Sequence, residues 1–466
     1  MTETGSMAAV VAATREGWRA ENRGAAQRLI ACYEVLQNCI RQGETGLDDD
    51  GGPAHEAIDS FDVAVNYLLA AMPISALRAE NMLVLADELH VRYPAVLAAL
   101  TDGLLELRIA TLMAAQMATV DPDILPVVQQ QVVDDYLASL EGGERLGENT
   151  IRGRIDGIIG HHDPNAVRQR RQDAARDRGV RLRKGADGMT GLNAVLASEE
   201  AAILAEAIEQ RVNEHTAAEA DAHAAAVAAA TAAGTPEPDD ESEHYPIAQR
   251  RADALMSLTC GDTTTAEGRE PAPLRPQVTV ISTAPGTTSD MPGPVVEFTR
   301  TGQAALQALL DMLAASDGAS LEHLDPRIGA ADTTRGALTY RPGAQLARRI
   351  RLRDGTCRHP GCLVPADGCD IDHVRPFNHA DPERGGHTVE TNLMCLCRRH
   401  HRFKTFSDWT YLLKPDGTLV VLAPDGQMML TRPAGPLGTY RQEQARTEAR
   451  AWQTQQRRSP DPTITD

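Results

Sequence analysis

Cysteine and histidine crowd into one stretch of this chain, from Cys357 to Trp409. It holds five of the eight cysteines and six of the fourteen histidines in 53 of the 466 residues. Within it, a CxxxxC hook closed by Pro360-Gly361 and a CxxH pair are separated by a long loop. Two such hooks can present four ligands tetrahedrally to zinc. The predicted ligands are Cys357, Cys362, Cys397 and His400.

We expect this zinc site to be structural, because three thiolates and one imidazole leave no position open for a substrate. Buried free thiols or a disulfide are the alternative, and they would be the default for a single cysteine pair. The N-terminus MTETGSMAAV lacks the basic and then apolar pattern of a signal peptide, and a cytoplasmic chain keeps its thiols reduced. Two hooks at this spacing therefore favour a metal.

A second site is predicted in the loop between the hooks. The alternation in CDIDHV indicates a strand that ends at Asp372 and His373, and a short helix is expected to carry His400 and His401. Neighbouring residues on a helix point about 100° apart, so His400 can face the zinc while His401 faces Asp372. Asp372 and His401 would then bind a second, harder metal, and His373 would be free to act as a base.

The arrangement resembles the HNH nucleases, whose pattern is Asp-His, then Asn, then a closing His on a strand–strand–helix unit. Asp372, His373, Asn392 and His401 match this pattern, and the four predicted zinc ligands match the subgroup that is framed by zinc. That subgroup commonly ends in CxxCH, where this chain has CxxHH. The segments RDGTCRHPGC and NLMCLCRRHHRFKTFSDW also look like those of actinobacterial repeat-type HNH proteins, in which a long helical domain of unassigned function comes first.

The resemblance implies a metal-dependent DNA endonuclease that hydrolyses phosphodiester bonds. His373 would be the general base, and one Mg²⁺ or Mn²⁺ ion on Asp372 and His401 would neutralise the scissile phosphate. Asn392 would tie the loop so that His373 keeps its orientation. The candidates for phosphate contacts are Arg375, Arg398, Arg399 and Arg402, each of which could equally be a surface charge. The alternative function is a DNA-binding or assembly protein with a zinc-stabilised, catalytically silent HNH module.

The charge is distributed unevenly along the chain. The net charge is −19, but residues 346–410 carry eleven Arg or Lys against eight acids, which suits local phosphate contact on an acidic body. A second basic stretch, residues 166–184, carries eight Arg or Lys against two acids. A solvated helical face and a DNA contact would both give that pattern. The chain has no run of 18 apolar residues, so we expect a cytoplasmic protein that does not bind a membrane. The expected partner is DNA.

The length favours two or three domains. We predict a mainly α N-terminal domain with a small ββα-metal, zinc-framed C-terminal domain. The expected parts are a flexible N-terminus at 1–27, a mostly helical domain at 28–340, an HNH nuclease domain at 343–430 and a disordered tail at 431–466. Within the helical domain we expect an acidic loop at 234–243 and a linker at 261–274. The tail is expected to hold at most one helix, at 441–455.

Overall fold

The computed structural model describes residues 6–46, 58–185, 189–236, 246–260, 277–281, 295–298, 302–305, 310, 313–314 and 320–458. The chain divides into two compact units. The first comprises Met1–Arg170, Thr279–Ser289 and Glu322–Asp466, and the second comprises Arg171–Val278 and Asp290–Leu321. The predicted outline, a mostly helical chain with a small sheet-containing C-terminal region, is confirmed.

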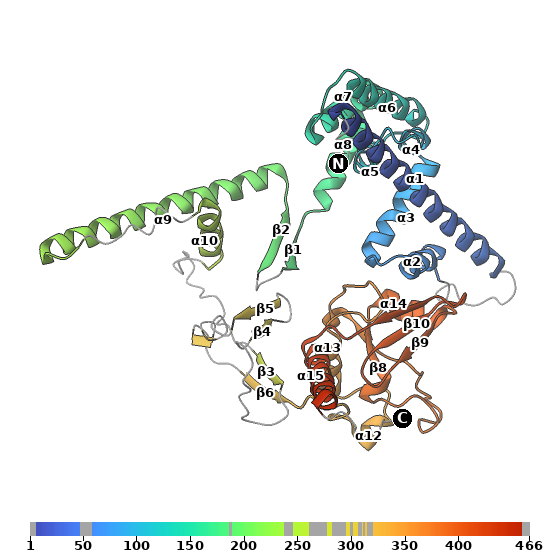
Figure 1. The fold of residues 1–466 in the computed structure, drawn as a ribbon, viewed down its shortest axis with the longest axis vertical. Coiled ribbons are helices and arrows are strands. Elements are labelled where there is room, and N and C mark those ends of the chain that lie inside the picture. The colour runs from blue at the N-terminus through green and yellow to red at the C-terminus, as the bar shows by residue number, and fades with distance from the viewer. Residues whose placement is uncertain are drawn as a thin grey trace, which may run out of the picture. The chain divides into compact units, whose positions relative to one another are not determined.

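In its described residues, the first unit begins with helices α1 to α7 and the first part of α8 (Figure 1). Their bounds are α1 Met7–Gly46, α2 Ser60–Ala71, α3 Ala76–Val91, α4 Pro94–Thr101, α5 Leu107–Gln116, α6 Leu125–Glu141, α7 Glu148–His162 and α8 Pro164–Arg176. Local sequence sets several of their starts: Asp59 and Ser75 cap α2 and α3 with their side-chain oxygens, and Pro94 opens α4. Leucine and alanine dominate the buried face, for instance Leu83, Leu89 and Leu100.

The prediction of a flexible N-terminus at 1–27 is wrong for residues 7–27, which form the first half of α1. Residues 7–18 are exposed, and continuous burial begins only around Asn22, Ala25 and Ala26. The exposed end of α1 packs against no other described element, so its sequence needs no apolar stripe and shows no helical periodicity of apolar residues. Its alanine-rich composition supports the helix through intrinsic propensity alone.

The C-terminal region of the first unit mixes short strands and helices. Its elements are α12 Thr334–Ala337, α13 Ala344–Asp354, η2 Ala366–Gly368, β7 Asp370–His373, η3 Glu390–Asn392, β8 Leu393–Leu396, α14 Arg398–Phe406, β9 Thr410–Leu413, β10 Leu419–Leu422, β11 Met428–Thr431 and α15 Pro436–Arg458. β7 pairs antiparallel with β8, with Asp370 opposite Leu396 and His373 opposite Leu393, and α14 follows β8 directly. β9, β10 and β11 form a separate antiparallel sheet in the order β11-β10-β9.

The tail at 431–466 was expected to be disordered apart from one possible helix at 441–455; the structure has helix α15 at Pro436–Arg458, which extends past both ends of that range. This helix is anchored at its start, where Leu437 is fully buried and Arg441 reaches the buried carboxylate of Glu390 at 2.5 Å. Gly435, just before the helix, lies so close to Leu352 that a Cβ atom there would be 2.2 Å from the Leu352 carbonyl oxygen. These are contacts across the fold, and the Gln- and Arg-rich composition of the segment carries no sign of them.

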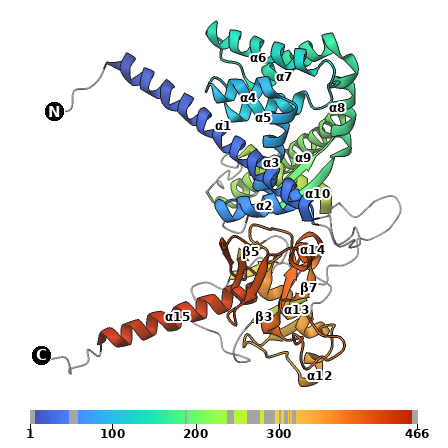
Figure 2. The ribbon, with the colours of Figure 1, turned by 90° about the vertical axis from the view of Figure 1, so that its right-hand side faces the viewer.

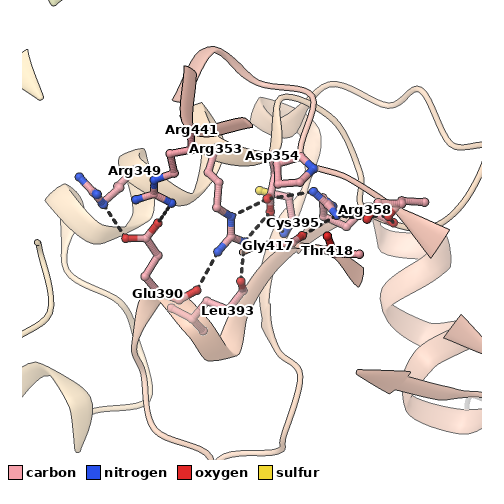
Figure 3. A network of polar contacts seen from close by, with 12 residues as sticks. Arg349, Arg353, Asp354, Arg358, Glu390, Leu393, Cys395, Gly417, Thr418 and Arg441 are labelled. Atoms are coloured by element: carbon pink, nitrogen blue, oxygen red, sulfur yellow. Dashed lines mark hydrogen bonds and ion pairs between the residues drawn. The ribbon is translucent and has the colours of Figure 1, made fainter. Parts of the chain in front are cut away.

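A buried network of charges holds the C-terminal region together (Figure 3). Glu390 in η3 is 1% exposed and binds Arg349 of α13 at 2.6 Å and Arg441 of α15 at 2.5 Å. Next to it, the Arg353 guanidinium binds Asp354 and donates to the carbonyl oxygens of Glu390 and Leu393, each at 2.7 Å. Glu390 also accepts from the Gly329 amide at 3.0 Å, so the network joins residues on both sides of 343–430 to residues inside it, and the compact region extends past both ends of the predicted module.

In its described residues, the second unit contains a hairpin of β1 Gly179–Lys184 and β2 Thr190–Val195, the helices α9 and α10, and short strands. Residues 186–188, between the two strands, lie outside the described residues. α9 Ser198–Ala233 and α10 Ile247–Cys260 are joined by ion pairs from Arg250 to Glu219 and from Arg251 to Glu209. β4 Val295–Phe298 pairs with β5 Gly302–Ala305. β3 Gln277–Ile281 and β6 Ser320–Leu324, which the division splits between the two units, pair with each other.

The predicted linker at 261–274 and most of the predicted acidic loop at 234–243 lie outside the described residues. No single helix in the described part of the chain has the length and apolar composition to cross a membrane; only α2 and α3 taken together, with a 118° bend between them, meet that test.

Candidate metal centre and the site beside it

The two predicted hooks meet at one point. The donor atoms of Cys357, Cys362, Cys397 and His400 all lie within 4.8 Å of one another, so this group could hold a metal ion. The Nδ1 atom of His400 lies 3.5 Å from the Cys357 sulfur and 3.3 Å from the Cys397 sulfur. The prediction that these four residues come together in one cluster that could hold a metal ion is confirmed.

Local backbone geometry explains how the hooks close. Gly361 turns the first hook with a φ of +72°, a conformation that glycine adopts without strain. Cys397 is the N-cap of α14, and its amide donates to the Cys357 sulfur at 3.3 Å. His400 follows in the first turn of that helix, which directs its ring at the cluster. A helix start and a glycine turn therefore bring the two ends of the cluster together.

His359, which lies inside the first hook, packs against the cluster from behind. Its ring is buried and stacks on the ring of His400, with centroids 3.9 Å apart and planes 15° apart. Burial lowers the pKa of His359 well below its usual value, so the ring is neutral. Its Nε2 donates to Asn66 Oδ1 at 2.5 Å, and its Nδ1 accepts from the Tyr411 hydroxyl at 2.7 Å. The His359 ring, which stacks on the proposed metal ligand His400, is therefore fixed by a hydrogen bond at each of its two nitrogens.

Helix α2 lies against this hook, and both ribbon views place α2 beside the C-terminal region that contains the hook (Figures 1 and 2). Asn66 belongs to α2, and the amide of Ala76, the first residue of α3, donates to the Gly361 carbonyl at 3.0 Å. Tyr67 of α2 packs edge-on against Trp409, with ring centroids 5.4 Å apart. The N-terminal helices therefore supply part of the environment of the metal cluster.

Arg399 belongs to this contact between helices. Its guanidinium binds Asp62 of α2 at 2.5 Å and also pairs with Glu80 of α3. The Arg399 guanidinium, which was predicted to contact a phosphate, is thus neutralised by these two carboxylates. In this arrangement Arg399 joins α14 to the helical part of the unit, so the prediction that it contacts DNA conflicts with the observed pairing.

Asp372 of β7 and His401 of α14 lie next to each other. Asp372 Oδ1 is 3.4 Å from His401 Nε2, and Asp372 Oδ2 is 2.9 Å from Lys404 Nζ. Burial would raise the pKa of Asp372, but the hydrogen bond from His401 and the charge of Lys404 outweigh it and lower this pKa. The hydrogen bond to Asp372, with a smaller contribution from Asp370, raises the pKa of His401. His400 and His401 point to different sites, as helix geometry requires.

Two residues at this site were missed from the sequence. Asp370 Oδ2 lies 3.0 Å from His401 Nδ1, on the ring nitrogen opposite the one that faces Asp372. Asp370 stands two residues before Asp372 in a strand and Lys404 three residues after His401 in a helix. Both spacings put a residue on the same face as its neighbour, which is the signal that could have found them.

His373 lies at the end of β7 and packs against other aromatic rings. Its Nε2 lies 2.8 Å from the Thr388 hydroxyl, and the Tyr340 ring stacks on it with planes 13° apart. Phe377 packs against both rings. Burial lowers the pKa of His373 more strongly than the neighbouring Asp372 raises it, so the ring is neutral near pH 7. A neutral imidazole in such a place can accept a proton.

Asn392 ties together the loop that carries these groups. Its side-chain oxygen accepts from the Arg375 amide at 2.9 Å, and its side-chain nitrogen donates to the carbonyl oxygens of Arg375 and His387. Its own carbonyl accepts from the Val374 amide, the residue after His373. All these contacts use backbone partners, so Asn392 fixes the path of the loop.

The other predicted phosphate contacts lie on the surface. Arg375 donates to the Arg384 carbonyl at 2.8 Å, Arg398 lies 3.5 Å from Asp370, and Arg402 is exposed on α14. Arg349, Arg353 and Arg358, in contrast, are buried. They contributed to the charge balance of 346–410 without contributing to its surface, so the basic character of the exposed face is smaller than the sequence count suggests.

The second basic stretch, 166–184, is also partly paired. Arg170 binds Asp156 of α7 and the Gln116 carbonyl, and its side chain is 20% exposed. Arg176 pairs with Asp173 at 2.9 Å, and Arg178 pairs with Glu200. Several members of the stretch thus serve local structure, and Arg170 in particular does not face solvent as a free charge.

The chain matches a family model described as "Domain of unknown function (DUF222)" over residues 16–354. It is 30% identical over 449 residues to "Uncharacterized protein Rv3776" of Mycobacterium tuberculosis, covering 89% of this chain and 77% of that one. It is 32% identical over 464 residues to "Uncharacterized protein Rv2100" of the same organism, covering 88% and 75%. No solved structure matches it. The extent of the family match and of these two likenesses shows that the chain belongs to the DUF222 family.

Proposed function

We propose that this protein is a metal-dependent DNA endonuclease of the HNH type. One observation carries the proposal: a buried neutral histidine, His373, lies beside an aspartate–histidine pair, Asp372 and His401, on a strand–strand–helix unit next to the Cys3His cluster. The order of the elements β7, β8 and α14 and the positions of these residues match the pattern of that nuclease class.

The donor sets support two different metals. Three thiol sulfurs and one imidazole nitrogen in a closed, largely buried group suit zinc in a structural role. Asp372 and His401, whose Oδ1 and Nε2 atoms are 3.4 Å apart, would hold Mg²⁺ or Mn²⁺, because a carboxylate oxygen is a ligand that these ions prefer. Asp370 would orient His401 from behind, as a carboxylate commonly does for a metal-bound histidine.

His373 would take the proton from the attacking water, because its ring is neutral and held in place by Thr388 and Tyr340. Asn392 would keep the loop closed over the site through its backbone hydrogen bonds. Arg375, Arg398 and Arg402 are exposed and would meet the DNA backbone near the cut. A divalent ion bound at Asp372 and His401 would supply charge neutralisation at the phosphate.

The test is nicking of supercoiled plasmid by the full chain, with and without Mg²⁺, in three histidine variants and one control. His373→Ala should lower the rate about 10²–10⁴-fold, as removal of a general base does, while zinc content and thermal unfolding stay unchanged. His401→Ala should also lose activity, but a high Mn²⁺ concentration should restore part of it. His400→Ala should lose zinc. His387→Ala, an exposed histidine in the same loop, should cleave normally.

Two outcomes would overturn the proposal. Normal cleavage by His373→Ala would show that this ring is not the base. Absence of cleavage by the wild-type protein with either ion, on supercoiled, linear and single-stranded DNA, would leave a zinc-stabilised module without nuclease activity. In that case the alternative, a DNA-binding or assembly protein, would be the better description.

A further inference from the structure

We infer that the Thr388 hydroxyl fixes which ring nitrogen of His373 carries the proton, and so makes the opposite nitrogen a permanent acceptor. Thr388 is thereby a positioning residue for His373. The catalytic meaning of the inference rests on the proposed function, but the hydrogen-bond assignment itself does not.

The assignment follows from counting protons. Thr388 is 1% exposed, and its hydroxyl has a single hydrogen. That hydrogen is donated to the Thr339 carbonyl oxygen at 2.5 Å, since a carbonyl can only accept. The same hydroxyl oxygen lies 2.8 Å from His373 Nε2. Because the hydroxyl proton is already used, the contact is a hydrogen bond only if Nε2 carries a proton and donates it.

The rest of the ring's surroundings keep this tautomer in one orientation. The amide of Thr388 donates to the Ala337 carbonyl at 2.9 Å, so the hydroxyl is held by its backbone as well as by Thr339. Tyr340, the next residue after Thr339, covers one face of the His373 ring at a centroid distance of 5.5 Å. With Nε2–H fixed, Nδ1 of the neutral ring keeps its lone pair and is the nitrogen available to accept a proton.

The partners of Thr388 come from the end of the family domain. Ala337 ends α12, and Thr339 and Tyr340 follow it, all within the residues 16–354 that match DUF222. The family domain thus contributes the segment that sets the proton on the candidate base. A nuclease module cut at residue 343 would lose this segment.

The decisive measurement is the tautomer of His373 in the zinc-loaded full chain labelled with ¹⁵N-histidine. The His373 ring signals are identified as those that disappear in His373→Gln. We expect a protonated, pyrrole-type Nε2 and a bare, pyridine-type Nδ1 in the wild-type spectrum. A bare Nε2 in the wild-type protein would overturn the inference without reference to any variant.

Two substitutions then separate the hydroxyl from the shape of the side chain. Thr388→Val keeps the volume but removes the hydroxyl, so the His373 signals should become those of a mixture of both tautomers; Thr388→Ser should keep the wild-type pattern. In the cleavage assay, Thr388→Val should lower kcat about 10-fold, the scale of one lost hydrogen bond, with KM unchanged, and Thr388→Ser should restore it.

The two proposals fail in different ways. If the wild-type protein cuts no DNA yet His373 shows the Nε2–H tautomer that Thr388→Val abolishes, the endonuclease proposal fails and the tautomer inference stands. If the protein cuts DNA but Thr388→Val keeps both the wild-type tautomer and the wild-type kcat, the inference about Thr388 is overturned and the endonuclease proposal stands.

Discussion

Replacing Glu390 with glutamine should destabilise the C-terminal region more than any exposed substitution nearby. The Glu390 carboxylate is 1% exposed and accepts from Arg349 at 2.6 Å, from Arg441 at 2.5 Å and from the Gly329 amide at 3.0 Å. A glutamine at this position keeps one acceptor oxygen and turns an NH₂ donor toward a guanidinium. The guanidinium of Arg349 or Arg441 therefore loses its carboxylate partner, and the repulsion between two hydrogen-bond donors lowers the stability of the folded state further.

The size of the effect follows from the burial. Breaking a buried ion pair by removing one partner costs about 3–5 kcal/mol. Since the amide retains one acceptor, we place Glu390→Gln near the lower end, at about 3 kcal/mol. For a folding unit of 150–250 residues this lowers Tm by about 6–12 °C. Glu383→Gln, an exposed glutamate in the same loop, should change Tm by less than about 1 °C.

Acidification provides a second readout of the same residue. Burial alone would raise the pKa of Glu390, but the hydrogen bonds and charges of Arg441 and Arg349 outweigh it, so the folded-state pKa is lowered. Its stabilising effect is therefore present above the unfolded-state pKa of about 4.3 and is lost as the pH falls through the folded value. The Tm difference between wild type and Glu390→Gln should shrink on going from pH 7 to below that range. Protonation of the zinc ligands affects both proteins alike.

The assay is calorimetric or circular-dichroism melting of the full chain with bound zinc, at several pH values. If Glu390→Gln and Glu383→Gln melted together at pH 7, or if the difference between wild type and Glu390→Gln did not depend on pH, the buried network would not stabilise the region as argued.

Three more predictions test other contacts. Cys397→Ser should remove about one zinc per chain, as measured by mass spectrometry, and should melt the C-terminal region because metal binding there supplies folding free energy; full zinc content would refute the cluster. Arg399→Met should destabilise the protein by about 1 kcal/mol and speed hydrogen exchange in α2, without changing the salt dependence of DNA binding; a salt slope reduced by about one would make it a phosphate contact after all. Neutralising Arg168 and Arg171 should weaken DNA binding and its salt dependence more than neutralising Arg170, whose guanidinium is already paired; an equal effect of all three would contradict this.

The metal cluster was predictable because its signal is local. Two hooks, a glycine turn and a helix N-cap are short-range features, and the split between His400 and His401 follows from helix geometry alone. The same holds for strand β7, which the alternation in CDIDHV predicts. The second strand, β8, was expected only from the resemblance to a strand–strand–helix unit.

The features that escaped prediction depend on partners far away in the sequence. The sequence around Asn66 does not indicate that this residue binds His359, and the sequence around Arg441 does not indicate that it binds Glu390. The counting of charges failed for the same reason, since Arg349, Arg353 and Arg358 look like surface arginines until their buried partners are known. The first half of α1 was missed, and α15 was predicted only as a possible, shorter helix, because neither has an apolar stripe of ordinary width.

The contact between Asn66 and His359 joins residues 293 positions apart, and that separation has a kinetic meaning. Loop closure becomes only slowly more costly with length, by about 0.6 kcal/mol per doubling, so the contact loses little equilibrium stability for being so remote. Its timing is another matter. During synthesis, α2 and α3 leave the ribosome long before the first hook is made. Until then, the surface of these helices that contacts Gly361 and Arg399 in the folded protein is exposed to solvent. The nascent helices should therefore be open to proteolysis or chaperone binding until the C-terminal third of the chain has been made.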